Sequence, residues 1–125
     1  MAAELPAQLR NQLQLFQQLQ QQAQVIVGQR AQLEAQLKET ERTLEELAKV
    51  SADAPLYRAA GALLVRAKDK AAIEADLKDA KETTEVRVTS LKRQEEKLRE
   101  RLTALQKELQ AALAAQQGRV AGGPR

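Results

Sequence analysis

The 125-residue chain suffices for one structural unit, and Ala, Leu, Gln, Glu, Lys and Arg dominate it, as in long helices and coiled coils. It contains no Cys and no His, which excludes disulfides, thiolate or imidazole metal sites and the Cys–His and Ser–His–Asp classes of enzyme. The net charge of +3 arises from basic and acidic residues interleaved along the chain, with only one Phe and one Tyr for stacking on bases. We therefore expect no enzyme activity, no metal, no cofactor and no nucleic-acid partner.

The N-terminus shows no basic region followed by an apolar run, so the sequence predicts no signal peptide. The longest nearly apolar run, Ala59 to Val65, is far too short to span a bilayer. We expect a protein without a membrane partner, located in the cytoplasm.

The first predicted element is a helix over about residues 6–51. Pro6 suits its first turn, and Pro55 disfavours helical geometry at the preceding residue, so the helix ends near Ser51. Apolar residues recur at alternating steps of three and four, which predicts one narrow stripe, here called a seam, that faces a partner helix. The first seam consists of Leu9, Gln12, Phe16, Leu19, Ala23, Ile26, Arg30, Leu33, Leu37, Thr40, Leu44 and Leu47.

A β-hairpin is predicted next, over about residues 56–67. Two short apolar runs, residues 56–60 and 63–67, flank the turn residues Gly61 and Ala62. The alternatives are an apolar loop or a helix that continues past Pro55.

A second helix is predicted over about residues 70–117, with Asp69 as its N-cap and residues 118–125 as a flexible tail. Its seam consists of Leu77, Ala80, Thr84, Val88, Leu91, Glu95, Leu98, Leu102, Leu105, Leu109 and Ala112. The seam steps four and four near Thr84, where we expect a local adjustment. The predicted fold class is mainly α: a two-helix antiparallel coiled coil joined by a single β-hairpin, forming one unit over residues 1–117.

The two seams predict a register, because a short connection makes the helices antiparallel. The apolar residues of a seam occupy the two positions called a and d of a seven-residue repeat, and in an antiparallel pair an a position of one helix faces a d position of the other. With this pairing the numbers of two facing residues add up to about 121. Leu33 then faces Val88, and Leu19 faces Leu102.

Two features exceed what a simple coiled coil needs. The hairpin carries more apolar surface than its own helices can cover, which predicts strand pairing with hairpins of other subunits; the alternative is that it folds onto the helix ends.

The second feature is charge: residues 11–29 contain no charged residue and nine Gln, and they pair with residues 103–117, where only Lys107 and Glu108 are charged. Leu13 and Leu15 lie outside the first seam and Leu113 outside the second, adding apolar surface to this end. The alternative is a Gln-rich helix with an ordinary frayed end.

Together these residues resemble the β subunits of the prefoldin family, hexameric co-chaperones of archaea and eukaryotes. The resemblance covers about residues 8–110 and is carried by Phe16-Gln-Gln-Leu-Gln-Gln-Gln-Ala-Gln24, Thr43-Leu-Glu-Glu-Leu47, the hairpin segment 56–66 and Arg93-Gln-Glu-Glu-Lys-Leu-Arg-Glu-Arg-Leu102. The single hairpin indicates the β class, since α subunits carry two.

The resemblance implies an α2β4 hexamer with a prefoldin α subunit, in which the hairpins form a shared β-barrel and the coiled coils extend from it. In the family, partly exposed apolar residues at the coiled-coil tips hold non-native client proteins and deliver them to a group II chaperonin without ATP. Mapped onto this sequence, the predicted client-contact set is Leu9, Leu13, Phe16, Leu105, Leu109 and Leu113. The predicted subunit-interface set is Leu56, Tyr57, Ala59, Leu63, Leu64 and Val65.

Two other function classes stay open. A structural coiled-coil scaffold would dock one defined partner on its charge-poor end, whereas a holdase would suppress aggregation of unrelated proteins. A nucleic-acid-binding rod would show binding that weakens steeply with salt.

Overall fold

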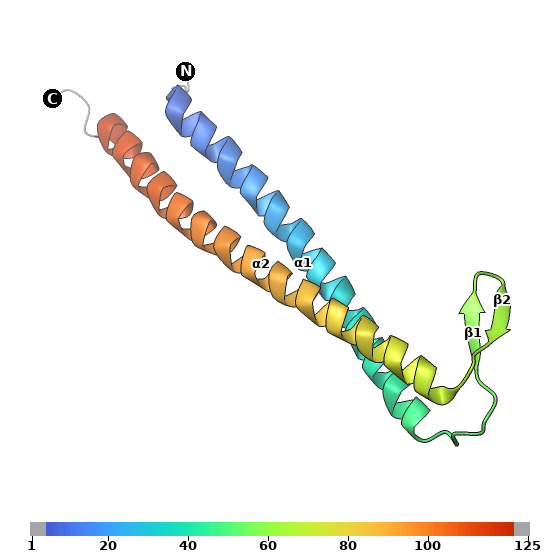
Figure 1. Ribbon diagram of the computed structural model, residues 1–125. Helices are drawn as coiled ribbons and strands as arrows, with labels where there is room; N and C mark the ends of the chain where they lie inside the picture. Colours follow the sequence, from blue (N-terminus) through green and yellow to red (C-terminus); the bar gives the residue numbers. More distant parts are fainter. Residues whose placement is uncertain (1–4, 122–125) are drawn as a thin grey trace. The chain divides into compact units, whose positions relative to one another are not determined.

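The computed structural model describes residues 5–121, which form two long helices separated by a two-stranded hairpin (Figure 1). The order is α1 (Ala7–Ala48), β1 (Tyr57–Ala60), β2 (Leu63–Arg66) and α2 (Lys70–Ala121). The predicted fold class is therefore confirmed. No helix within residues 5–121 is long and apolar enough to cross a membrane.

The first helix ends three residues earlier than expected. Its last turn tightens, because the amides of Lys49 and Val50 donate to carbonyls three residues back, Glu46 and Leu47. Ser51 then starts a turn: its carbonyl accepts from the Ala54 amide at 3.1 Å, and its Oγ accepts from the Asp53 amide at 3.3 Å. The helix thus stops before Pro55 imposes its own restriction.

The second helix begins as predicted and extends further than predicted. Asp69 is its N-cap, since the Asp69 carboxylate accepts a hydrogen bond from the Ala72 amide at 2.7 Å. Residues 118–121, which the sequence assigned to a flexible tail, continue the helix, because a single glycine such as Gly118 costs a helix interior only about 1 kcal/mol. The rest of the predicted tail, residues 122–125, lies outside the described residues.

The hairpin matches the predicted segment. Its turn is two residues long, and Gly61 has φ +60°, the left-handed region that a hairpin turn of type II′ requires at its first central position. The Ala67 amide donates to the Leu56 carbonyl at 2.9 Å, so pairing continues one step beyond the strands.

The described chain groups into two compact units, each containing a segment of both helices: residues 5–28 with 91–121 (unit 1) and residues 29–90 (unit 2). Unit 1 has a core of five buried leucines, namely Leu9, Leu19, Leu98, Leu105 and Leu109. In unit 2 the buried residues are Leu33, Leu47 and Val88, and the hairpin belongs to this unit.

The predicted seams account for this burial with one correction. Every position of the first seam is buried or half-buried. In the second seam Ala80 is exposed, and Lys81 is half-buried in its place. The step from Leu77 is thus four and not three. A lysine is tolerated at a half-buried position because its aliphatic stem can be buried while its ammonium stays accessible, and the Lys81 ammonium pairs with Glu85 at 3.9 Å.

Candidate interaction surfaces

The two hairpin strands expose apolar side chains on both faces. The register pairs Tyr57 with Arg66, Arg58 with Val65, Ala59 with Leu64 and Ala60 with Leu63. Directly paired residues share a face, so one face carries Tyr57 and Leu64, and the other carries Leu63 and Val65. These four side chains are 51–75% exposed, which leaves both faces of the hairpin uncovered by the described chain.

The backbone also leaves both hairpin edges available. The bond from Ala67 to Leu56 identifies that pair as hydrogen-bonded, and such pairs alternate along an antiparallel ladder. Arg58–Val65 and Ala60–Leu63 are then hydrogen-bonded pairs as well. The N–H and C=O groups of Tyr57 and Ala59 consequently point outward from β1, and those of Leu64 and Arg66 from β2. Such edges can accept a further strand.

The structure therefore brings the predicted interface residues together on one small element. Five of the six are exposed, and Leu56, just before β1, is half-buried. An ion pair between Arg58 and Asp76 ties β1 to α2 within unit 2.

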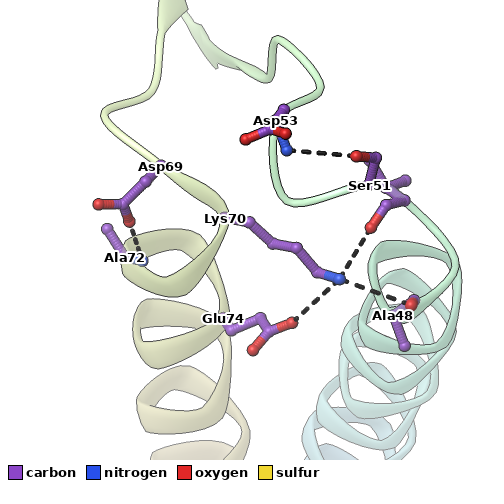
Figure 2. Close-up of polar contacts among 8 residues, drawn as sticks. Ala48, Ser51, Asp53, Asp69, Lys70, Ala72 and Glu74 are labelled. Atoms are coloured by element: carbon purple, nitrogen blue, oxygen red, sulfur yellow. Dashed lines mark hydrogen bonds and ion pairs between the residues drawn. The ribbon is translucent and has the colours of Figure 1, made fainter.

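Lys70, here called the Lys70 clamp, connects the start of α2 to the end of α1 on the two sides of the hairpin. Figure 2 shows the Lys70 side chain reaching from the start of α2 toward the end of α1. Its ammonium donates to the Val50 carbonyl at 2.8 Å and to the Ala48 carbonyl at 3.5 Å, and it lies 3.8 Å from the Glu74 carboxylate. The last turn of α1 has no basic residue of its own, so Lys70 supplies the positive charge that carbonyls at a helix C-terminus favour.

Replacing Lys70 with methionine is expected to lower the stability of unit 2. The variant keeps the aliphatic stem and loses the charged donor, so about 1–3 kcal/mol of unfolding free energy should be lost. Urea unfolding followed by circular dichroism measures the change. Lys78→Met, at an exposed position of the same helix, is the matched control; equal losses in the two variants would contradict the clamp.

The predicted client-contact residues, all in unit 1, divide by burial. Leu9, Leu105 and Leu109 are only 4–8% exposed and belong to the leucine core. Leu13 and Phe16 are half-buried and pack against that core, and Leu113 is exposed. Half of the set therefore holds the two helices together in this closed arrangement.

Three exposed apolar residues of unit 1 are absent from the predicted set: Leu15, Val25 and Val27. The signal in the sequence was available, because each lies outside the three-and-four spacing of the seam and nothing in unit 1 requires an apolar side chain there. They lie in the segment from Asn11 to Gln29, which contains no charged residue.

A groove of about 320 Å³ lies between the helix ends of unit 1. Leu9 and Gln12 of α1 line it together with Glu108 and Ala112 of α2. This neighbourhood agrees with the predicted antiparallel register. Metal chemistry has no candidate in the described residues, since no three His, Cys, Asp or Glu side chains cluster there to hold an ion.

Comparisons with known proteins give one consistent result. Residues 10–116 match the family described as prefoldin subunit. The chain is 50% identical to prefoldin subunit beta of Archaeoglobus fulgidus over 92% of this chain and 98% of that protein. It is 45% identical to prefoldin subunit beta of Methanococcoides burtonii, over 93% of this chain and 98% of that protein. Among solved structures, the crystal structure of the prefoldin beta subunit from Thermococcus strain KS-1 superposes with a TM-score of 0.80 at 36% identity, covering 90% of this chain and 97% of that one.

Proposed function

Because the chain belongs to the prefoldin subunit family, we propose that it is the β-class subunit of an ATP-independent holdase that binds non-native proteins and delivers them to a group II chaperonin. Family members are chaperone subunits, so the chain has a co-chaperone role in an oligomeric prefoldin assembly. We propose further that the complex contains two prefoldin α subunits and four β subunits (α2β4), that it holds clients and delivers them without ATP, and that it is located in the cytoplasm.

Assembly is assigned to the hairpin. The hairpin has two exposed apolar faces and two open edges, as expected for part of a larger sheet. In such a sheet, neighbouring hairpins would pair with the edges and other apolar side chains would cover the faces. The proposed interface residues are Leu56, Tyr57, Ala59, Leu63, Leu64 and Val65, and the proposed sheet is a barrel shared among subunits.

Client holding is assigned to unit 1. The observation that carries this assignment is the coincidence of exposed apolar side chains with a charge-free segment of 19 residues, Asn11 to Gln29. Such a surface contacts apolar sequences without demanding a complementary charge, as a binder of many clients must. Weak contacts of this kind gain affinity when several subunits engage one client.

Within the proposed client-contact set, Leu13, Phe16 and Leu113 are at least partly accessible while the helices are paired. Leu9, Leu105 and Leu109 would reach a client only if the helix ends separated.

Aggregation of unrelated unfolded proteins tests the function. The complex assembled with an α-class subunit should suppress aggregation of several unrelated clients without nucleotide, and added salt should change the effect little. Protection of a single defined partner would favour the scaffold alternative. Binding of nucleic acid that weakens steeply with added salt would favour the nucleic-acid alternative.

A further inference from the structure

One face of α1 in unit 1 is exposed and free of charged side chains. Leu15, Gln18, Gln22 and Val25 follow one another at steps of three, four and three, so they form a continuous line along the helix; this line is called the outer stripe. Leu15 is 39% and Val25 58% exposed, and both glutamines are exposed. A shallow depression lies beside Gln18, Gln22 and Val25.

The outer stripe is accessible without any change in the seam. Separating the helices of unit 1 would instead expose the five buried leucines of its core. A client that binds the outer stripe leaves this core intact. Binding therefore costs no free energy of leucine packing.

We propose that the outer stripe binds extended, uncharged apolar segments of non-native proteins while the seam of unit 1 stays closed. This inference rests on the proposed holdase function and specifies its contact surface and binding mode.

The chemistry of the stripe selects this occupant. Leu15 and Val25 each offer an apolar contact, and the glutamines between them each offer an amide donor and an amide acceptor. An unfolded segment presents unpaired backbone N–H and C=O groups, which primary amides can satisfy in either direction. A charged segment would lose hydration and find no opposite charge among these four residues.

The length of the stripe adds a second constraint. Leu15 and Val25 are ten residue steps apart on the helix, roughly 15 Å along its axis. An extended chain covers that distance in about four or five residues. The preferred segment therefore carries apolar side chains about four residues apart, with uncharged residues between them.

The test uses the complex assembled with its α-class partner and a fluorescent, chemically unfolded client. The double variant Leu15→Gln with Val25→Gln removes the apolar contacts and keeps helix-forming, uncharged side chains. It should assemble with unchanged helical circular dichroism and hold the client about 5- to 20-fold more weakly, since each side chain is only partly covered when bound. Val86→Gln is the matched control, because Val86 is an exposed valine of α2 outside unit 1; it should bind as the parent does.

A crosslinked parent separates the stripe from an opened seam. Gln12→Cys and Glu108→Cys place two thiols on the groove between the helix ends of unit 1, in a chain that has no other cysteine. Joined by a short bismaleimide, they keep the helices paired. The crosslinked complex should hold the client as well as the uncrosslinked one and lose holding when Leu15→Gln and Val25→Gln are added.

Each other outcome has a distinct meaning. If crosslinking abolishes holding, clients enter through an opened seam, and the stripe inference is wrong while the holdase function stands. Undiminished holding by the Leu15→Gln, Val25→Gln variant also overturns the inference and leaves the function intact. If the unmodified parent complex holds no client, the proposed function itself fails.

Discussion

A chain carrying Leu63→Asp is expected to fold and to lose its assembly. Leu63 is 69% exposed on the hairpin, so its replacement breaks little within the chain. In the proposed sheet shared between subunits the same position would be buried, and an unpaired carboxylate there would cost several kcal/mol. Native mass spectrometry should show free chains, and circular dichroism should show retained helices.

Val65→Asp should have the smaller effect of the two. Val65 lies directly opposite Arg58 on the neighbouring strand, so a carboxylate at residue 65 has a guanidinium beside it. Combining both substitutions should abolish assembly. Val86→Asp adds the same charge at an exposed position of α2 and should leave the mass of the assembly unchanged. An intact assembly of the double variant would mean that the hairpin is not the assembly element.

The open edge of β1 can be tested through the backbone alone. Ala59→Pro removes an N–H that points outward, so the hairpin should persist while pairing between subunits weakens. Ala60→Pro is the matched comparison, because it removes an N–H that bonds to Leu63 inside the hairpin. Loss of assembly in both variants, with the hairpin amides of the Ala59→Pro variant still protected from hydrogen exchange, supports edge pairing. Normal assembly of Ala59→Pro would exclude β1 as the paired edge.

The second large effect is expected in the core of unit 1. Leu19 is 3% exposed and belongs to the five-leucine core, so Leu19→Ala should cost about 2–5 kcal/mol of unfolding free energy. Leu15→Ala makes the same chemical change four residues earlier at an exposed position and should cost less than about 1 kcal/mol. Urea unfolding and hydrogen exchange of the unit 1 helices measure both. Similar losses at the two positions would contradict the observed orientation of α1.

Local sequence patterns predicted most of this fold for identifiable reasons. The alternation of three and four specifies which residues of a long helix face its partner, and Leu9, Leu33 and Val88 are buried as expected. Pro55 and Gly61 mark the hairpin because few residues tolerate their backbone geometries. Residues 80 and 81 show where apolar character misleads: Ala80 leaves two successive steps of four near Thr84, whereas Lys81, which is half-buried, restores the alternation of three and four.

The interaction surfaces were predicted less completely. Leu109 and Leu113 are one helical turn apart, yet one is buried and the other exposed, and a prediction based on apolar character placed both in one contact set. The Lys70 clamp was not predicted, because its acceptors are backbone carbonyls of Ala48 and Val50, about twenty residues away and invisible to side-chain patterns.

Native mass spectrometry of this chain co-expressed with an α-class subunit, with and without an unfolded client, measures assembly and client holding together. The expected result is a complex of four copies of this chain and two α subunits that gains the mass of one client in the absence of nucleotide. Several unrelated clients should give the same result, and the Leu63→Asp, Val65→Asp variant should give no complex. A chain that stays monomeric beside its partner, or a complex that gains no client mass, would contradict it.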